Sequence, residues 1–588
     1  DARPMQVVSD KIGDNASAKT SAALRAWSQG SRALKAIEWE KLLPSILSLI
    51  GLEKIPDQPI SNKTERNQTR FGRFTIKANP VGGSYVAALG SKTRRKGYSV
   101  YAVMPETSVD SVFDQIPTGE RREANLILYP GILSWDDRRA LRILADKKKI
   151  TALVIDNAVI AFMGLQTEPR FTTLQRVTLP FSIFPHWAPR VAGDVPDELF
   201  VGRTEIIDKI ISPEGSIFVY GGRQLGKSAL LHRIERDFNR LDNKLAIYID
   251  FKVERIGEEN EPEYLWTVLR NRLHEYKVLP PTITSTKPDS IEKGIRDWLE
   301  ADPERAILLL CDESDAFLQS EARERVINNR VRSFPNVSVL KGLMDKTHRR
   351  FKPVFAGLHQ VQRIADIPNS PLAHGGEDIL VGPLDSTEAW ELVVRPFKAL
   401  GYEFESLDLV WRLLAFTNHQ AGLVQIVCDE LYKKMRDAQT QIPPGQPPYI
   451  ITAADVDSVI TSREVRDFIA ERFRLTIQLE DRYFVIAMVV ALLSLDHGYT
   501  NDYEASLILE FCREAWPSGF ESLTEKGLSV YLDEMVGLNV LIHGKEPTHY
   551  GLRSPNVVHI LGDRDTIAKQ LAEGRFELPL QYNARVSR

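Results

Sequence analysis

Gly221-Gly222-Arg223-Gln224-Leu225-Gly226-Lys227-Ser228 is the stretch that decides the fold of this chain. It matches the pattern G-x-x-x-x-G-K-[ST], in which backbone N–H groups of a glycine-rich turn surround a pyrophosphate. The pattern requires a buried strand before the turn and a helix after it. The largely apolar run 216–220 and the amphipathic segment 229–238 meet both requirements, and the helix would point its N-terminal dipole at the phosphates. The stretch therefore predicts a phosphate-binding loop.

The residue types in this loop predict separate roles. Lys227 is expected to reach the β- and γ-phosphates, and the Ser228 hydroxyl is expected to bind Mg²⁺. Backbone N–H groups around them are expected to hold the phosphates. The predicted cofactor-binding residues of the loop are Gly221, Gly222, Arg223, Gln224, Leu225, Gly226, Lys227, Ser228 and Ala229.

A second part of the expected site follows the continuous apolar run 306–311. Such a run suits a parallel strand buried on both faces, and it ends in Asp312 and Glu313. We expect Asp312 to help hold Mg²⁺ and Glu313 to polarise the water that attacks the γ-phosphate. Glu313 and Lys227 are therefore the predicted catalytic residues. Asp315 either extends this acidic cluster or only caps the following helix.

Length and composition set broader limits. The 588 residues are enough for roughly three to five domains. With 43% hydrophobic and 26% charged residues, the chain has the composition of an ordinary soluble protein. A net charge of -4 gives no overall attraction to nucleic acid or to an anionic membrane. Three widely separated cysteines predict a reducing, cytoplasmic location, and no apolar run approaches the roughly 20 residues that span a bilayer.

The region before the loop predicts three parts. Residues 16–43 predict one long helix that ends at Pro44. Residues 63–178 alternate short buried runs with helical segments, which predicts a small accessory α/β domain. Its run 152–155 ends in Asp156, but no phosphate loop precedes that acid, so we expect no catalysis there. The proline-rich stretch 179–196 predicts a linker.

The C-terminal region predicts a winged helix. Helical segments at 480–495, 503–515 and 523–536 precede a hairpin with strands at 540–543 and 550–553. The third helix and the wing together contain four acidic and three basic residues. A helix that reads DNA normally carries net positive charge, so the sequence favours a contact to protein over a contact to nucleic acid.

The box Leu199-Phe200-Val201-Gly202-Arg203, before the phosphate loop, carries a family resemblance. It resembles the entrance to STAND-type ATPases and their relatives, the initiator-like AAA+ ATPases, where the box lies over the adenine. The resemblance covers roughly 199–561 and implies that Gly202 and Arg203 bind the cofactor. It also implies that His359 or Gln360, at the end of the next strand, senses the γ-phosphate. A plain loop role remains open for both residues.

The same resemblance implies a helical lid after the nucleotide core. In the family, this lid carries a Gly-x-Pro-type motif near the nucleotide. The comparable stretch 417–422 here (TNHQAG) contains no proline. The resemblance implies a molecular switch that binds ATP and Mg²⁺, hydrolyses ATP, and couples its nucleotide state to a protein partner or to its own assembly. Members of this class act in signalling, including bacterial and antiviral defence.

Two alternatives to a hydrolysing switch remain open. One is an initiator-like ATPase that loads onto DNA, and the other is a module that holds ATP without hydrolysing it. The expected fold class is α/β, with a P-loop core built on a parallel sheet. The predicted divisions are an N-terminal helical segment (1–62), the accessory α/β domain (63–178), a linker (179–198), the P-loop ATPase core (199–380), the helical lid (381–438), a linker and helix (439–475), the winged helix (476–561) and a C-terminal tail (562–588).

Overall fold

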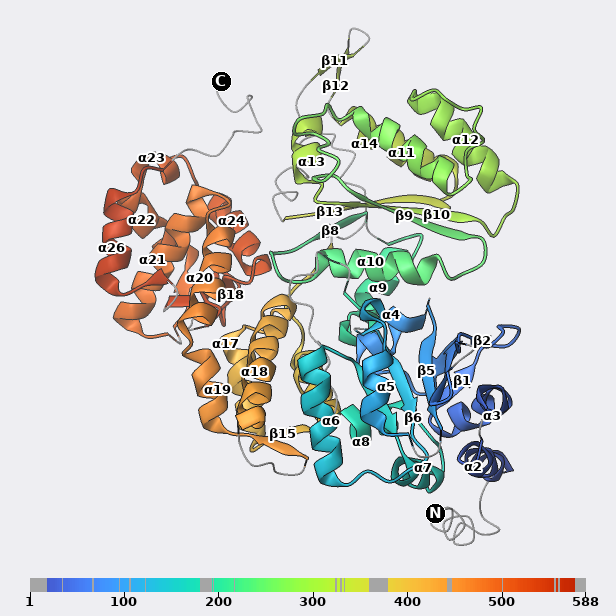
Figure 1. Ribbon diagram of the computed structural model, residues 1–588. Coiled ribbons are helices and arrows are strands. Elements are labelled where there is room, and N and C mark those ends of the chain that lie inside the picture. Colours follow the sequence, from blue (N-terminus) through green and yellow to red (C-terminus); the bar gives the residue numbers. More distant parts are fainter. Residues whose placement is uncertain are drawn as a thin grey trace.

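The computed structural model describes most of the chain between residues 18 and 576 (Figure 1). An N-terminal α/β part, a central parallel sheet with helices on both faces, and two mainly helical parts follow one another along the chain. The residues between 18 and 576 that are not described are 34, 66–67, 95, 105–106, 122, 180–192, 194, 216, 323–324, 328–329, 333, 359–378, 442–446, 500, 555–556 and 559–560.

Two helices, not one, open the described chain: α2 (Ala18–Gly30) and α3 (Ala36–Leu49). The prediction that a helix ends at Pro44 is wrong, because Pro44 lies inside α3. Proline removes one helical hydrogen bond, but the buried side chains of Trp39, Leu43 and Ile46 hold this helix in the apolar core. Trp27 on α2 donates a hydrogen bond from Nε1 to Asn157 Oδ1 at 2.7 Å. Tertiary packing therefore overrides the local stop signal.

The predicted accessory α/β domain contains a five-stranded sheet in the order β2-β3-β5-β6-β7. Strands β5, β6 and β7 are parallel, and β3 runs antiparallel to β5. The strands are β2 (Ser61–Asn62), β3 (Phe71–Ile76), β5 (Tyr98–Val103), β6 (Asn125–Leu128) and β7 (Ala152–Ile155), with β1 (Leu52–Lys54) and β4 (Ala78–Pro80) paired separately. The main helices are α5 (Val109–Gln115), α6 (Trp135–Lys148), α7 (Asn157–Gly164) and α8 (Phe171–Thr178), and α4 (Ser91–Arg94) is one turn long.

Asp156, at the end of β7, has a structural role. Its carboxylate accepts hydrogen bonds from the backbone N–H groups of Val159 and Leu133, both at 2.9 Å. It also pairs with Arg138 at 2.5 Å. Asp156 thus caps α7 and fixes the preceding loop.

The central sheet has the order β14-β8-β13-β10-β9, and all its neighbouring strands are parallel. Strands β8 (Phe218–Tyr220) and β10 (Ala306–Asp312) fall on the two predicted apolar runs. The other strands of the sheet are β9 (Lys244–Asp250), β13 (Phe351–Gly357) and β14 (Ile379–Leu380), which lies at one edge. Because parallel strands end at the same edge, the phosphate loop after β8 lies beside the acids after β10.

Helices cover both faces of this sheet (Figure 1). Two separate apolar clusters, one on each face, hold them against the strands. One face carries α9 (Thr204–Ile211) and α10 (Lys227–Phe238). The other face carries α11 (Tyr264–Glu275), α12 (Pro288–Glu300), α13 (Asp315–Ala322) and α14 (Pro335–Lys346). A hairpin of β11 (Arg325–Ile327) and β12 (Arg330–Arg332) joins α13 to α14.

The helical part after β14 extends beyond the predicted lid boundary at 438. Its helices are α16 (Ser386–Ala399), α17 (Leu407–Phe416), α18 (Ala421–Gln441) and α19 (Ala453–Ile460). Strands β15 (Tyr402–Phe404) and β16 (Tyr449–Ile451) pair in parallel. Val456 and Val459 of α19 join the same apolar cluster as α16 and α18, so packing assigns α19 to this lid.

The C-terminal unit has its own apolar core. Helices α21, α22 and α24 and strands β18 and β19 lie where the sequence predicted the elements of a winged helix. Strand β17, at the start of the predicted helix 503–515, completes an antiparallel sheet in the order β17-β19-β18. Helix α26 falls in the range predicted as a tail, but its Ile567 and Leu571 are buried in this core. The elements are α20 (Arg463–Ile477), α21 (Asp481–His497), β17 (Tyr503–Glu504), α22 (Ala505–Ala515), α23 (Pro517–Phe520), α24 (Glu525–Gly537), β18 (Leu541–His543), β19 (His549–Leu552) and α26 (Arg564–Glu573).

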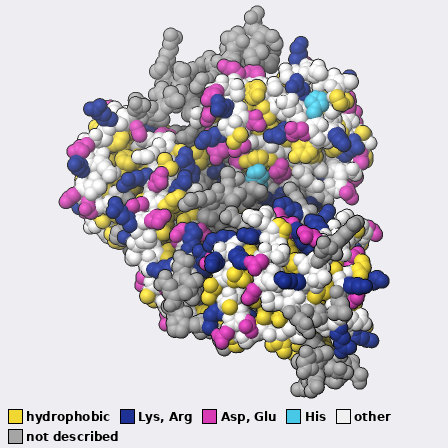
Figure 2. Space-filling model, viewed as in Figure 1, with side chains coloured by type: hydrophobic (Ala, Val, Ile, Leu, Met, Phe, Trp, Pro, Cys, Tyr) yellow, Lys and Arg dark blue, Asp and Glu magenta, His cyan; other side chains and the backbone are white. Residues whose placement is uncertain are grey.

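No helix in the described part of the chain has both the length and the apolar character needed to cross a membrane. All three cysteines are buried and unpaired. On the face shown in Figure 2, basic and acidic side chains are interspersed.

Candidate nucleotide-binding site

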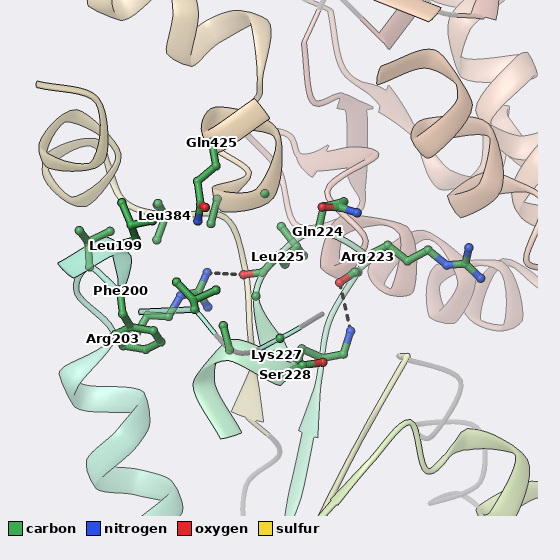
Figure 3. A pocket seen from close by; sticks show the side chains of 18 of the residues that line it. Leu199, Phe200, Arg203, Arg223, Gln224, Leu225, Lys227, Ser228, Leu384 and Gln425 are labelled. Atoms are coloured by element: carbon green, nitrogen blue, oxygen red, sulfur yellow. Dashed lines mark hydrogen bonds between the residues drawn. The ribbon is translucent and has the colours of Figure 1, made fainter. Parts of the chain in front are cut away.

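A cavity of about 480 Å³ lies between the central core and the lid (Figure 3). Its volume falls within the range of about 300–1,000 Å³ that is usual for small-molecule sites. Residues 222–229 of the phosphate loop and the start of α10 form one wall. The other lining residues are Gly193, Val195, Leu199, Phe200, Val201, Arg203, Lys252, Glu313, Leu358, Leu384, Leu392, Ala421, Gly422, Gln425 and Arg472.

The backbone of the phosphate loop turns sharply into α10. Gln224 and Gly226 have φ angles of 62° and 94°, in the left-handed region. Position 221 has no room for a side chain, because a Cβ there would lie 2.4 Å from the carbonyl oxygen of Val381. Helix α10 then begins at Lys227, so its N-terminal N–H groups face the loop, where an anion is favoured.

Lys227 lies at the centre of the loop. Its Nζ donates a hydrogen bond to the carbonyl oxygen of Gly221 at 2.8 Å. It also donates one to the carbonyl oxygen of Gly222 at 3.1 Å (Figure 3). Burial lowers the pKa of the Lys227 ammonium, and the nearby carboxylates of Glu313 and Asp312 oppose that shift. The structure thus places a buried cation against these two acids.

The two acids after β10 occupy different positions. Asp312 is buried; its Oδ2 accepts a hydrogen bond from the Tyr248 hydroxyl and its Oδ1 accepts one from Glu313 N, both at 2.9 Å. Burial and Asp312 raise the pKa of Tyr248. Glu313 lines the cavity, and its φ of 49° is strained for a residue other than glycine. Asp312 is not among the lining residues.

The donor set is compatible with Mg²⁺. This ion usually takes one or two protein ligands and completes its shell with substrate phosphates and water. Ser228 lines the cavity, and Asp312 lies next to the lining residue Glu313. The described residues contain no group of three or more His, Cys, Asp or Glu side chains that could hold a metal by itself.

The Gly-Arg box joins the core to the lid. The Arg203 guanidinium donates from Nη2 to the carbonyl oxygens of Leu225 at 2.6 Å and Gly382 at 2.9 Å, and Arg203 N donates to Glu388 Oε1 at 2.8 Å. Gly202 is not among the lining residues. A Cβ on Gly202 would lie 1.6 Å from Glu388 Oε1, so glycine leaves room for that carboxylate. Arg203 lines the cavity, but its guanidinium bonds to protein carbonyls.

The proline-free lid stretch reaches the site. Gly422 donates from its backbone N–H to the carbonyl oxygen of Gln224 at 3.1 Å. Ala421 and Gly422 both line the cavity. Leu384 N donates to the carbonyl oxygen of His419 at 3.0 Å, which fixes the turn before α18. Backbone contacts therefore seat the start of α18 on the phosphate loop.

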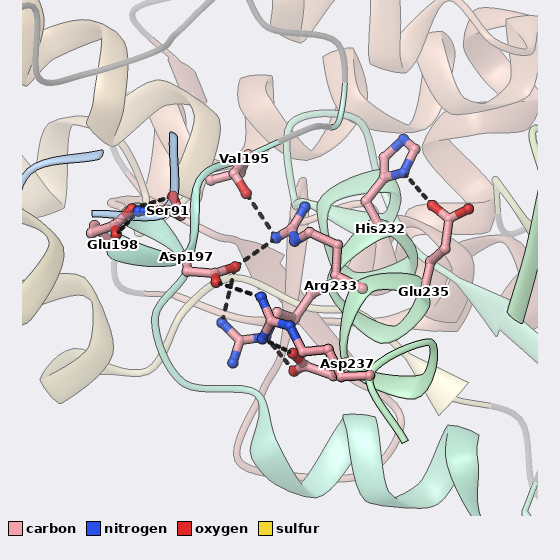
Figure 4. A network of polar contacts seen from close by, with 10 residues as sticks. Ser91, Val195, Asp197, Glu198, His232, Arg233, Glu235 and Asp237 are labelled. Atoms are coloured by element: carbon pink, nitrogen blue, oxygen red, sulfur yellow. Dashed lines mark hydrogen bonds and ion pairs between the residues drawn. The ribbon is translucent and has the colours of Figure 1, made fainter. Parts of the chain in front are cut away.

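The end of the predicted linker clamps the accessory domain to α10 (Figure 4). Glu198 accepts hydrogen bonds from Ser91 N at 2.7 Å and from Ser91 Oγ at 2.6 Å. Asp197 pairs with Arg236 at 3.1 Å and with Arg240 at 3.3 Å, both on or just after α10. Burial opposes the ionisation of Asp197, but the arginines outweigh it and hold its pKa below the ordinary value.

Two polar lining side chains that the sequence did not predict come from outside the core. Gln425 lies on α18, and Arg472 lies on α20. Gln425 is a polar residue within an apolar helical segment, which was a weak signal; nothing in the local pattern marked Arg472. The predicted sensor residues His359 and Gln360 lie outside the described residues.

The parallel sheet, the glycine-rich loop after β8 and the helix that follows define an α/β protein with a P-loop core. No model of a known protein family matches the chain. No curated protein matches it either.

Three solved structures are similar to part of this chain. The Orc1 protein of Aeropyrum pernix, in complex with DNA, is 15% identical, with 65% of this chain and 96% of that chain covered and a TM-score of 0.30. Cdc6p from Pyrobaculum aerophilum is 12% identical, with 64% and 98% covered and a TM-score of 0.28. Drosophila ORC bound to DNA is 14% identical, with 66% and 90% covered and a TM-score of 0.29. Similarity at this level assigns no function.

Proposed function

We propose that this chain is a cytoplasmic, STAND-like switch that binds ATP with Mg²⁺, hydrolyses it, and couples its nucleotide state to a protein partner or to self-assembly. One observation carries the proposal. Lys227, Ser228 and Glu313 of the core line the same cavity as Gln425 of the lid. A ligand held by the first three residues also touches the lid, so a change in the ligand changes the contact between the two parts.

Each core residue has a role in this proposal. Lys227 and the N–H groups of the loop bind the β- and γ-phosphates, and Ser228 and Asp312 hold Mg²⁺, which neutralises phosphate charge. Glu313 accepts a hydrogen bond from the attacking water and orients it. Lys227 must release the carbonyl oxygens of Gly221 and Gly222 to reach phosphate.

Helix α20 supports coupling to the C-terminal unit. Val465 and Ile469, near its start, belong to the apolar core that includes the lid, whereas Phe473 and Ile477 belong to the core of the C-terminal unit. Arg472, between these two groups, lines the cavity. A phosphate that attracts Arg472 would therefore act on a helix anchored in both cores.

The C-terminal unit also contacts the nucleotide loop directly. A Cβ on Gly222 would lie 3.0 Å from the carbonyl oxygen of Leu538, which shows how closely the two backbones approach. Asn539 Nδ2 donates to the carbonyl oxygen of Asn418, in the turn before α18, at 3.3 Å. These contacts give the unit a second connection through which nucleotide state can act on its position.

The test is nucleotide binding and ATP turnover by the purified chain beside Lys227→Ala and Glu313→Gln. We expect turnover by the wild type, loss of binding in Lys227→Ala, and binding without turnover in Glu313→Gln. Lys209→Ala and Glu205→Gln, which change exposed residues of α9, are the matched controls and should leave both activities unchanged. Tight binding by the wild type without turnover, alone or with added partner, would favour a nucleotide-holding module.

A DNA-loading ATPase is the second candidate, because the C-terminal unit contains the predicted winged-helix elements, namely α21, α22, α24 and a three-stranded antiparallel sheet. Charge argues against it: the segment 523–553 contains more acids than bases, and Asp533 on α24 accepts a hydrogen bond from Tyr550 on β19. Fluorescence anisotropy with duplex DNA at several salt concentrations decides between the two. Affinity that falls steeply with salt would favour the DNA-loading function.

A further inference from the structure

Gln425 is placed to contact a part of the ligand other than the phosphates, which the phosphate loop would bind. Gln425 lies one turn into α18, whose first turn is hydrogen-bonded to the loop through Gly422 and Gln224. In Figure 3 its side chain extends from the lid helix into the cavity, beside Leu384. The hydrogen bond between α18 and the phosphate loop therefore fixes the position of Gln425.

The Gln425 carboxamide is buried without a full set of partners. The residue is only 5% exposed, and its Oε1 has no hydrogen-bond partner among the described residues. A buried carbonyl oxygen without a donor costs free energy, and native structures rarely leave one unpaired without a reason. A ligand that brings an N–H donor into the cavity would remove this cost.

The surroundings of Gln425 suit a flat ring. Leu199, Phe200, Leu384 and Leu392 line the same cavity, whereas Lys227 and Ser228 line it at the phosphate loop. The cavity thus offers apolar side chains and the Gln425 carboxamide in addition to its cationic, hydroxyl-bearing part. A nucleotide has the matching division into an apolar, hydrogen-bonding base and a charged phosphate chain.

We propose that Gln425 selects adenine, with Oε1 accepting a hydrogen bond from the 6-amino group and Nε2 donating to an adjacent ring nitrogen. Glutamine can pair in this bidentate way with adenine, which offers a donor next to an acceptor. A purine without the amino group leaves Oε1 unpaired. A purine with a keto oxygen at that position places an acceptor against it. Gln425 is therefore a specificity-determining residue of the site, an inference that rests on the proposed function.

The experiment compares binding of ATP, GTP, purine riboside triphosphate (which lacks the 6-amino group) and inorganic tripolyphosphate. We expect the wild type to bind ATP about tenfold more tightly than purine riboside triphosphate, the difference that one neutral hydrogen bond supplies. GTP should bind at least as weakly as purine riboside triphosphate. In Gln425→Leu the preference for ATP should disappear, while affinity for tripolyphosphate stays at the wild-type value.

Lys434→Met, on an exposed part of the same helix, is the matched control and should keep the wild-type preference. A wild type without preference for ATP, or a Gln425→Leu protein that retains the preference, overturns this inference alone. A folded wild type that binds none of the triphosphates overturns the proposed function and this inference together. Thermal melting of each variant separates loss of recognition from loss of folding.

Discussion

Asp315, at the start of α13, gives the core a specific pH dependence. Its Oδ2 accepts a hydrogen bond from Leu358 N at 2.9 Å, which ties the end of β10 to the end of β13. The residue is partly exposed, but its Oδ1 is enclosed and has no partner within the described chain. Burial raises the pKa of the Asp315 carboxyl from 3.8 to about 7, against the opposing effects of the Leu358 N–H and of Lys227. Glu313 raises it further.

The sign of the effect follows from the two pKa values. Between about pH 4 and pH 7 the folded protein holds a proton on Asp315 that the unfolded chain has already released. The stability that Asp315 contributes is fully present below the unfolded pKa and is lost as the pH rises through the folded pKa. The folded and unfolded pKa of Asp315 differ by about 3, which corresponds to at most about 4 kcal/mol in the free energy of unfolding. This contribution is lost between pH 4 and pH 8.

Asp315→Asn removes this titration and keeps an oxygen that can accept from Leu358 N. Hydrogen exchange of β10 and β13, corrected for the intrinsic rate at each pH and measured without nucleotide in a chelator, reports the local stability. From pH 5 to pH 8 the wild type should lose stability relative to Asp315→Asn. Asp345→Asn, at an exposed position on α14, is the control. Equal pH slopes in the wild type and Asp315→Asn would refute the reasoning.

Three further substitutions test the contacts around the cavity. Arg203→Met removes two charge-assisted hydrogen bonds to backbone carbonyls; it should lower local stability by about 3 kcal/mol, and unchanged hydrogen exchange in residues 222–229 would contradict this. Arg472→Met should reduce the protection that ATP confers on α20, measured by hydrogen exchange with and without ATP; equal protection would argue against coupling through this arginine. Asp197→Asn weakens the partly exposed clamp on α10 and should cost about 1 kcal/mol, seen as a lower thermal midpoint; an unshifted midpoint would show that the clamp contributes little.

Local patterns predicted the two strands of the central sheet that precede the candidate site. Strands β8 and β10 fall on the predicted apolar runs, because a strand buried on both faces needs a continuous apolar sequence. The prediction for Pro44 was wrong because a local pattern does not determine the effect of this proline. Its effect depends on whether the helix around it is packed, and packing involves residues distant in sequence. The extent of the lid and the burial of α26 were missed on the same grounds.

The candidate site also contains some residues that the sequence predicted and others that only tertiary packing brings to the cavity. The loop 221–228 could be recognised because its chemistry depends on closely spaced residues and on the dipole of the next helix. Gln425 and Arg472 could not, because each lies about 200 residues or more from the loop and reaches the cavity only through the packing of its helix. Arg203 was identified, but its guanidinium bonds to the carbonyl oxygens of Leu225 and Gly382, which only the folded chain brings together.

The sequence by itself thus determined the phosphate loop, the strand that precedes it and the acids of β10, since periodicity and turn chemistry are local properties of the chain. The tertiary structure alone decided which side chains face the loop across the cavity. Sheet order and helix packing set those distances, and they place Glu313, Gln425 and Arg472 around a single cavity.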